Sequence, residues 1–307
     1  MRVLVTGAAG FIGSHVTDAL AARGDEVVGI DDLSSGERRF ITPGTRFEQV
    51  DIRTSEAAQL VRSFAPDGIC HLAAQISVSV SVREPLLDSD LNITGTLNLL
   101  VAAAEVGSRF VFSSSGGQVY GEPEEIPTPE TAPLRPVSPY GVSKLAAEQY
   151  LYQAHVQHGL GYAALRYSNV YGPRQNPHGE AGVVAIFCEG LLGRRGFKIH
   201  GPGTDTRDYV YVADVVRANL LALDSERSGH YNIGSGRETD VNRLYAIVAR
   251  RFGSNAEPEH GAERAGDIRR SAVDAALAAR ELGWRPEVSL EEGIGRTVDW
   301  FRSSAER

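Results

Sequence analysis

A tyrosine and a lysine four positions apart have the clearest potential for catalysis in this sequence. They are Tyr140 and Lys144, in the segment Ser138-Pro-Tyr-Gly-Val-Ser-Lys144, and on a helix this spacing places both side chains on one face. A free tyrosine has a pKa of about 10, and a neighbouring ammonium lowers that pKa because it favours the phenolate. A tyrosine whose pKa is lowered far enough can act as a base near neutral pH. Taken alone, the same spacing is also typical of a solvated helix face.

Three serines, Ser113–Ser115, follow an apolar run that begins at Arg109. We expect this run to be a strand of a parallel sheet, where ligands sit beyond the carboxyl ends of the strands. A hydroxyl at that place can hydrogen-bond the substrate oxygen that Tyr140 deprotonates. The alternative is a polar strand end whose serines satisfy loop amides.

A glycine-rich turn, Gly7-Ala-Ala-Gly10-Phe-Ile-Gly13, lies between the apolar run Val3–Thr6 and a helical pattern. Its three glycines allow a tight turn, a close approach of phosphates to the backbone, and close packing of the helix on the strand. The helix N-terminus then offers N–H donors and a positive dipole to a pyrophosphate. The position of the turn after the first strand predicts a dinucleotide site, with a turn that binds nothing as the alternative.

Acidic residues follow the next two apolar runs. Asp31 ends the second run, where a carboxylate accepts hydrogen bonds from ribose hydroxyls and repels a 2′-phosphate, so NAD is favoured over NADP. Asp32 is the alternative for this role. Asp51 follows the third run, where it either reaches the adenine amino group or caps a helix. The cationic nicotinamide ring of NAD would lower the pKa of Tyr140 further.

The elements that position these residues alternate between strands and helices. The expected strands are Val3–Thr6, Glu26–Ile30, Arg46–Val50, Gly68–Ala73, Arg109–Ser113 and Tyr162–Arg166. Such alternation predicts an α/β fold with a doubly wound, Rossmann-like parallel sheet. A later strand, Tyr209–Val212, and helices at Asp214–Leu223, Val241–Phe252 and Ser271–Leu282 complete the pattern. We expect an NAD-binding domain of residues 1–167 plus about 208–232, and a smaller C-terminal α/β substrate lobe of about 168–207 plus 233–307.

Composition excludes several classes of protein. Of 307 residues, 42% are apolar and 23% are charged, which is ordinary for a globular protein. No apolar run reaches the roughly 18 residues of a membrane span. A net charge of −8 without a basic block argues against a nucleic-acid partner. The two cysteines, Cys70 and Cys188, are too few for a metal cage or a disulfide scaffold, so we expect no metal and a cytoplasmic location.

A series of motifs along nearly the whole chain resembles the extended short-chain dehydrogenase/reductase family, most closely its UDP-galactose 4-epimerase branch. The motifs are the glycine-rich turn, His71-Leu-Ala-Ala74, Asn92 within Leu91–Thr96, Tyr140-x-x-x-Lys144, Arg166-Tyr-Ser-Asn-Val-Tyr-Gly-Pro173, Arg207-Asp-Tyr-Val210 and Arg264-Ala-Gly-Asp267.

The resemblance implies roles for individual residues. Catalysis would rest on Ser115, Tyr140 and Lys144, with Ser114 as a second choice because one extra residue precedes Val119. The implied NAD pocket comprises Gly7, Gly10, Phe11, Ile12, Gly13, Asp31, Asp32, Asp51, Ile52, Ala73, Ala74, Asn92, Tyr140, Lys144 and Tyr167. The implied UDP-sugar site comprises Ser115, Tyr140, Asn169, Arg174, Arg207, Arg264 and Asp267. Arginines are the residues that a diphosphate needs in an otherwise acidic chain. Surface ion pairs are the alternative for Arg207 and Arg264.

The loop after Ser115 distinguishes among the reactions of this family. The 4,6-dehydratases carry Asp-Glu after the catalytic hydroxyl, and the decarboxylases that form UDP-xylose carry a glutamate in the same loop. Here the positions hold Gly116 and Gly117. The resemblance therefore implies a UDP-hexose 4-epimerase, which oxidises C4 transiently and returns the hydride to either face. A dehydratase, a decarboxylase, a keto-reductase and a non-catalytic NAD sensor are the alternatives.

The substrate and the assembly follow from the same resemblance. UDP-glucose is the default hexose. UDP-glucuronate competes, because Arg174 or the pair Arg194-Arg195 can hold a carboxylate, and 2-acetamido sugars need a roomier pocket. The family usually pairs through two helices, here about Pro85–Val106 and Ser138–His158, so we expect a homodimer.

Overall fold

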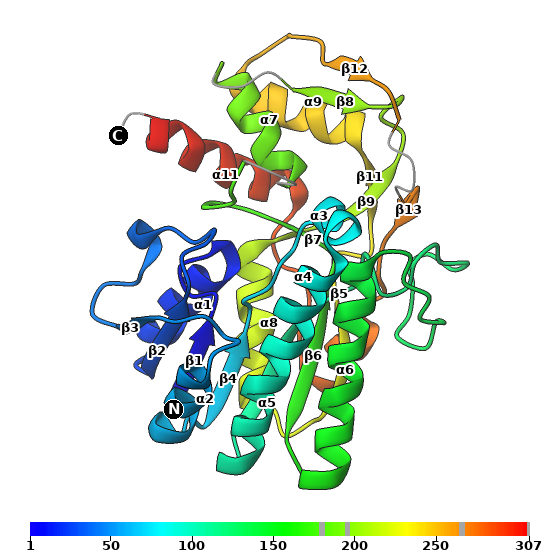
Figure 1. Cartoon of the computed structure of the whole chain (residues 1–307). Coiled ribbons are helices and arrows are strands. Elements are labelled where there is room, and N and C mark those ends of the chain that lie inside the picture. The colour runs from blue at the N-terminus through cyan, green and yellow to red at the C-terminus, as the bar shows by residue number, and fades with distance from the viewer. Residues whose placement is uncertain (178–181, 194–196, 264–267, 306–307) are drawn as a thin grey trace.

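A seven-stranded parallel sheet forms the centre of the larger lobe (Figure 1). The computed structural model describes residues 1–177, 182–193, 197–263 and 268–305. In sheet order the strands are β10 (Gly229–Ile233), β6 (Tyr162–Tyr167), β5 (Arg109–Ser115), β4 (Gly68–His71), β1 (Arg2–Thr6), β2 (Glu26–Asp31) and β3 (Arg46–Gln49). The chain runs outward in one direction from β1 to β3 and in the other from β4 onward, so a topological switch point lies between β1 and β4. Ligands of doubly wound sheets bind at such a point.

Helices cover both faces of this sheet, each over its own apolar core. One face carries α2 (Ser55–Phe64), α5 (Gly95–Val106) and α6 (Pro139–His158). The other carries α1 (Phe11–Arg23), α8 (Val212–Asp224) and α10 (Ala276–Glu281). Shorter segments complete the larger lobe: the 3₁₀ turn η1 (Arg38–Phe40), α3 (Val78–Arg83), α4 (Pro85–Ser89) and the π-helical turn η2 (Asp90–Thr94), which joins α4 to α5.

The smaller lobe lies above the carboxyl ends of the large sheet (Figure 1). A four-stranded sheet combines β7 (Asn169–Tyr171), β9 (Thr206–Tyr211), β11 (Glu238–Asp240) and β13 (Arg270–Ser271). A two-stranded sheet pairs β8 (Lys198–His200) with β12 (Glu259–Gly261). Three helices, α7 (Val183–Leu191), α9 (Val241–Phe252) and α11 (Leu290–Ala305), build a third apolar core with aromatic contacts such as Phe187 on Tyr245.

The predicted doubly wound α/β fold is confirmed, with differences at the ends of elements. The strand expected over Gly68–Ala73 ends at His71, because the next two amides bond the side-chain hydroxyl of Thr6 instead of a backbone carbonyl of a neighbouring strand. The helix expected over Ser271–Leu282 is wrong in its first part: Ser271 belongs to β13, and the helix begins at Ala276, whose amide donates to Asp274.

The chain crosses between the lobes more than once. β9 belongs to the small sheet, whereas α8, which follows it directly, packs on the large one, and β10 forms the edge of that large sheet. The proposed residue boundaries of the two lobes stay a prediction. Among the described residues, no helix is both long and apolar enough to traverse a lipid bilayer.

Candidate active site

The glycine-rich turn brings the start of α1 to the switch point between β1 and β4. Gly7 has a φ of +67°, and a Cβ on it would lie 2.9 Å from the Ala73 amide nitrogen. Gly10 donates its amide to the Gly7 carbonyl at 3.0 Å and is the N-cap of α1, where no side chain caps the helix. The first amides of the helix, those of Phe11, Ile12 and Gly13, therefore have no side-chain partner within the part of the chain that the structure describes. This arrangement binds phosphate.

Asp31 lies beside this turn at the end of β2. Its side chain is buried, and its two oxygens accept hydrogen bonds from the amides of Ala9 at 3.0 Å and Leu33 at 2.8 Å. Burial raises the pKa of Asp31, the two hydrogen bonds lower it, and the charge of Asp32 raises it. Each carboxylate oxygen retains a second lone pair for a ribose hydroxyl. Asp32 is exposed and instead accepts from the amide and the hydroxyl of Ser34.

Asp51 and Ile52 lie after β3. Asp51 forms hydrogen bonds with Arg53, which also reaches Asp90, and these bonds to Arg53 lower the pKa of Asp51. The helix-capping alternative for Asp51 is wrong, because Thr54 is the N-cap of α2. Ile52 is buried in the core between the sheet and α5. The predicted contact of Asp51 with adenine stays a prediction.

The loop after β4, Leu72–Ser77, forms the other wall of the switch point. Thr6 accepts hydrogen bonds from the Leu72 and Ala73 amides at 3.0 and 2.9 Å. Asn92 holds the next part of the loop, because its side-chain amide accepts from the Gln75 N–H and donates to the Gln75 carbonyl, each at 2.9 Å. Asn92 therefore supports the predicted Ala73-Ala74 contact through the backbone.

Tyr167 ends β6 directly beside Ser115 in the sheet register. Its hydroxyl bonds the side chain of Asn219, and its carbonyl accepts from the Gly116 amide at 2.8 Å. Burial raises the pKa of Tyr167. The residue thus fixes the loop that follows Ser115. Together with the uncapped start of α1 and the buried Asp31, these features fit a bound NAD.

The predicted catalytic residues Ser115, Tyr140 and Lys144 come together at the carboxyl end of β5. Ser138 caps α6 by accepting the Gly141 amide at 3.1 Å, and this cap places Tyr140 in the first turn of the helix. Tyr140 is hydrogen-bonded to Ser115. The Lys144 ammonium donates to the Ser113 carbonyl at 2.7 Å and lies 5.7 Å from the centre of the Tyr140 ring.

Burial dominates the pKa values of this pair. It raises the pKa of Tyr140, the charge of Asp88 raises it further, and only the hydrogen bond with Ser115 lowers it. Burial also lowers the pKa of Lys144 to about 8, against the opposing effects of Asp88 and Glu148. Removal from water thus outweighs the charge effects at this site. A Tyr140 base near neutral pH, which is expected from the ammonium together with the cationic nicotinamide ring, stays a prediction for the NAD-bound protein.

A buried ion pair lies beside Ser114, the chain neighbour of the predicted catalytic serine. Arg166 of β6 makes a two-pronged contact with Glu148 of α6, with N–O distances of 3.0 and 2.6 Å, and both side chains are almost completely buried. Ser114 donates to the same carboxylate. Ser114 is thus committed to Glu148, whereas Ser115 contacts Tyr140. The sequence interpretation missed Glu148, although it lies one helical turn beyond Lys144 on the same face.

The predicted substrate residues occupy different surroundings. Asn169 is exposed on β7, with its side-chain oxygen 4.0 Å from where a Cβ of Gly117 would lie. Arg207 on β9 donates to its neighbour's carbonyl, at Thr206, and forms no ion pair with any described residue. Arg264 and Asp267, like the pair Arg194-Arg195, lie outside the described residues.

Arg174 is placed differently from the expectation of a sugar contact. It has a φ of +67°, pairs with Asp18 of α1 at 2.7 Å, and lies 5.7 Å from the centre of the Phe40 ring. Asp18 also accepts from Thr42 at 2.6 Å. Arg174 thus ties the segment after β7 to α1, and its guanidinium already has a carboxylate partner.

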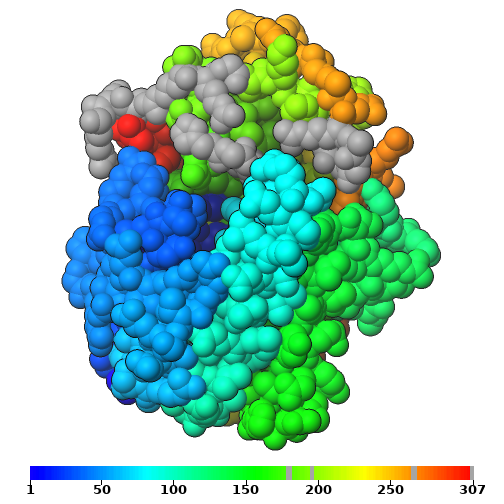
Figure 2. All heavy atoms as spheres, in the orientation of Figure 1, coloured from blue at the N-terminus to red at the C-terminus, as the bar shows by residue number. Residues whose placement is uncertain are grey.

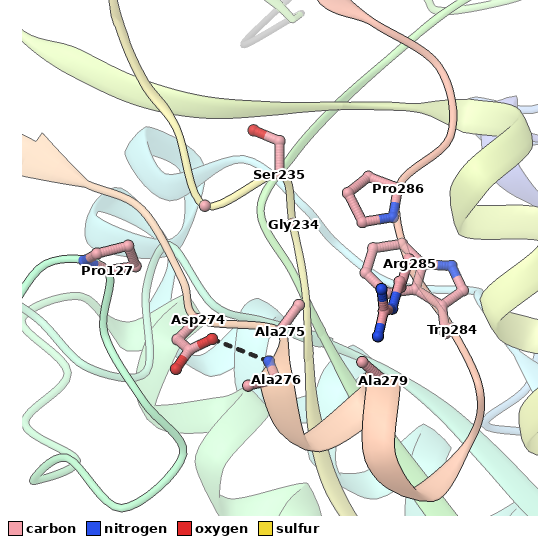
Figure 3. A pocket seen from close by; sticks show the side chains of 11 residues that line it. Pro127, Gly234, Ser235, Asp274, Ala275, Ala276, Ala279, Trp284, Arg285 and Pro286 are labelled. Atoms are coloured by element: carbon pink, nitrogen blue, oxygen red, sulfur yellow. Dashed lines mark hydrogen bonds between the residues drawn. The ribbon is translucent and has the colours of Figure 1, made fainter.

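The surface is hollowed between the two lobes, and atoms of the N-terminal segment lie at the bottom of the hollow (Figure 2). A separate pocket of about 210 Å³ is bordered by the loop at Pro127, by Gly234–Gly236 after β10 and by the segments around α10 (Figure 3). Asp274, at its edge, is engaged by the amide of Ala276. None of the residues that line this pocket belongs to the predicted site, so we assign it no role.

Comparison with known proteins gives consistent relatives. The NAD dependent epimerase/dehydratase family matches residues 3–234. A UDP-glucose 4-epimerase of Mycolicibacterium smegmatis is 47% identical over 313 residues, covering 100% of both chains. The structure of UDP-glucose 4-epimerase from Thermotoga maritima with UDP-glucose superposes with a TM-score of 0.97 at 47% identity, covering 99% of this chain and 100% of that one. The Thermus thermophilus UDP-glucose 4-epimerase in complex with NAD gives 0.93 at 46%, with coverage of 99% and 100%. This chain therefore belongs to the NAD dependent epimerase/dehydratase family.

Proposed function

We propose that this chain is an NAD-dependent 4-epimerase that interconverts UDP-glucose and UDP-galactose. One observation carries the proposal: Ser115, Tyr140 and Lys144 meet at the end of β5, beside an uncapped helix N-terminus at the switch point. Relatives that are 46 to 47% identical over their full lengths are UDP-glucose 4-epimerases.

In the proposed reaction, Tyr140 takes the proton from the sugar 4-hydroxyl while Ser115 hydrogen-bonds the same oxygen. Bound NAD, held by the Gly7–Gly13 turn and Asp31, supplies a hydride acceptor for C4 and a cationic ring that favours the Tyr140 phenolate. Lys144 stabilises the phenolate through its charge. After the 4-keto sugar turns over, the hydride would return from the reduced nicotinamide to the opposite face of C4 while Tyr140 returns the proton to the oxygen. C4 then has the inverted configuration, and NAD is regenerated with no net oxidation.

The loop after Ser115 supports epimerisation over elimination of water. A Cβ on Gly116 would lie 2.9 Å from the Val273 side chain and 3.0 Å from the Arg166 carbonyl oxygen, so position 116 has no room for a carboxylate side chain. Position 117 has room, but it holds glycine. Neither position therefore supplies the second acid/base pair that a dehydratase or a decarboxylase would need.

Two further features support the choice of substrate and cofactor. Arg174 uses one terminal nitrogen to pair with Asp18, which partly neutralises its charge toward the carboxylate of a glucuronate, while its Nη1 atom has no hydrogen-bond partner among the described residues. The buried Asp31 carboxylate would repel the 2′-phosphate of NADP, which disfavours a keto-reductase that consumes NADPH and releases NADP in each cycle. UDP-glucose is therefore the first substrate to test, ahead of UDP-glucuronate and UDP-N-acetylglucosamine.

The test is incubation of the purified protein with each of these three UDP-sugars, with products identified by proton NMR. We expect a C4-inverted hexose from UDP-glucose and no net NADH. Tyr140→Phe should abolish turnover while its NAD content after denaturation stays at the level of the unsubstituted protein. A dehydrated or decarboxylated product, or an active Tyr140→Phe enzyme, would refute the proposal.

We also propose a homodimer formed through the segment 85–106 and α6. Apolar side chains are exposed along these two helical segments, including Leu86 at 86%, Val101 at 54% and Val156 at 62%. Burying them against a second copy would remove this apolar surface from water. Light scattering should give twice the chain mass, and Val101→Asp should shift it toward the monomer. A monomer at micromolar concentration contradicts the proposal.

A cytoplasmic location accords with the two cysteines, which are both free and buried.

A further inference from the structure

A fully buried carboxylate, Asp88, lies behind the catalytic helix and has no part in the reaction described above. It is the fourth residue of α4, and its exposed fraction is 0%. One carboxylate oxygen accepts from the side-chain amides of Gln75 at 2.7 Å and Asn92 at 3.0 Å. The other accepts from the hydroxyl of Ser143 at 2.6 Å. Asp88 therefore joins the loop after β4, the π-helical turn and α6.

The hydrogen-bond partners of Asp88 favour the ionised form of its carboxyl group. All three are hydrogen-bond donors, and two of them are amide groups that can only donate at the nitrogen. An array of donors around both oxygens stabilises the ionised carboxylate. Among the described residues no arginine or lysine forms an ion pair with Asp88. The buried negative charge of Asp88 is therefore not neutralised by an ion pair with any described residue.

The cation on which Asp88 acts is Lys144, the chain neighbour of its hydrogen-bond partner Ser143. Two carboxylates raise the pKa of Lys144 against the lowering effect of burial, Asp88 first and Glu148 second. Glu148 is already paired with Arg166 at 2.6 Å. The charge of Asp88 is not cancelled in this way, and Asp88 has the larger effect of the two on the lysine.

We propose that Asp88 is a positioning residue of the active site, whose fixed negative charge holds Lys144 in its protonated form and whose bond to Ser143 fixes α6 against the loop after β4. The inference rests on the proposed function, in which Lys144 must be an ammonium ion to stabilise the Tyr140 phenolate. Asp88 touches neither substrate nor cofactor in this view. It acts through Lys144.

The other titratable groups near Lys144 do not replace Asp88. His71 of β4 lies within the field of the lysine, and burial lowers its pKa to about 3, so it is neutral at physiological pH. Glu148 of α6 and Arg166 of β6 neutralise each other. Tyr140, one turn away on α6, is uncharged until it gives up its proton. Removal of the Asp88 charge should therefore leave Lys144 with only the paired Glu148 as a compensating anion.

The sequence makes a direct measurement feasible, because Lys144 and Lys198 are its only lysines. The NAD-bound enzyme labelled with [¹³Cε]lysine should give two lysine resonances, and the exposed Lys198 serves as the internal reference. Asp88→Asn keeps the shape of the side chain, since its oxygen can accept from both amides and its nitrogen can donate to Ser143. We expect the pKa of Lys144 to fall by about one pH unit in this variant.

The same change should move the dependence of kcat on pH. Asp88 raises the pKa of both Tyr140 and Lys144, so its neutralisation lowers both, and the whole bell-shaped profile should move to lower pH. Near the pKa of Lys144, a drop of about one pH unit reduces the protonated fraction, and with it kcat, about fivefold. A purely structural role would lower kcat at every pH without moving the profile.

Ser143→Ala is the matched control, because it removes the bond to α6 and keeps the charge. We expect lower kcat at all pH values with an unchanged Lys144 titration. Asp88→Ser is a second neutral variant, for use if Asp88→Asn retains no NAD. An unchanged Lys144 titration in a neutral variant, or an equal change in Ser143→Ala, would overturn the inference. The NMR titration needs no turnover, so it tests Asp88 even if no UDP-hexose is epimerised, which is the separate failure of the proposed function.

Discussion

Lys144 should make the folded protein less stable near neutral pH, and the size of the effect follows from its surroundings. Burial lowers its pKa from an ordinary 10.5 to about 8, and the charges of Asp88 and Glu148 recover only part of the loss. A pKa lower in the folded chain means that the folded chain holds the proton less firmly than the unfolded chain. At pH 7, where the amine is charged in both states, the difference costs about 3 kcal/mol of stability.

The sign of the pH dependence follows directly. Between pH 8 and 10.5 the unfolded chain still carries a proton that the folded chain has released, so the contribution of Lys144 to stability rises with pH. Lys144→Met removes the titrating group and hence this dependence. The free energy of unfolding of the variant minus that of the unsubstituted protein should therefore fall by about 2 kcal/mol from pH 7 to pH 9.5.

Urea unfolding of nucleotide-free protein at four pH values across this range, at one protein concentration, measures that difference. All other titrating groups are common to both proteins, so their contributions cancel. Lys198→Met is the matched control, because the Lys198 side chain is 61% exposed, and its difference should stay constant with pH. A constant difference for Lys144→Met as well would refute the reasoning, because the ammonium would then carry no penalty from burial.

Three further changes test other parts of the site. Glu148→Ala leaves the buried Arg166 guanidinium without its carboxylate partner and should lower the free energy of unfolding in urea by about 3–5 kcal/mol. A change within experimental error would mean that water replaces the carboxylate. Gly13→Ala places a Cβ against the Gly7 carbonyl oxygen, so the purified variant should lose its NAD. Gly24→Ala places a Cβ where no atom lies within 4 Å, and it serves as the comparison for stability alone. Arg207→Ala should raise KM for UDP-glucose about 10- to 100-fold with little change in kcat, since a lost charge-assisted contact to a diphosphate is worth about 1.5–3 kcal/mol; an unchanged KM would remove Arg207 from the substrate site.

Local pattern was enough to predict the framework of the site. Strand-like runs alternating with helical segments place Gly7–Gly13 after β1 and Ser113–Ser115 at the end of β5. Parallel strands end at one edge of the sheet, so these two features had to meet near the switch point. Tyr140 and Lys144 are four residues apart, so a helix over their segment is enough to bring both side chains to the same edge. These inferences depend on neighbours in the chain and on one rule of sheet topology.

The buried charges could not be predicted in the same way. In the sequence, Asp88 and Glu148 are ordinary polar positions of helices, and such residues mostly face solvent. Asp88 is buried only because α4 packs against α6, and its partner Ser143 is 55 residues away along the chain. Glu148 likewise meets Arg166 across the gap between α6 and β6. Burial depends on which helix faces which strand, and the periodicity of one segment does not contain that information.

Burial of Tyr140 and Lys144 could not be predicted from the sequence for the same reason, and it sharpens the chemistry. The sequence shows a cationic neighbour of the tyrosine, but desolvation acts on both groups and makes each resist its charged form. The site without its cofactor therefore favours a neutral tyrosine. The phenolate becomes favourable only when further positive charge enters the same water-poor space, which the nicotinamide ring would supply. Asp88 then has a double effect: it keeps Lys144 cationic and opposes early loss of the Tyr140 proton, so that deprotonation is coupled to the presence of the oxidised cofactor.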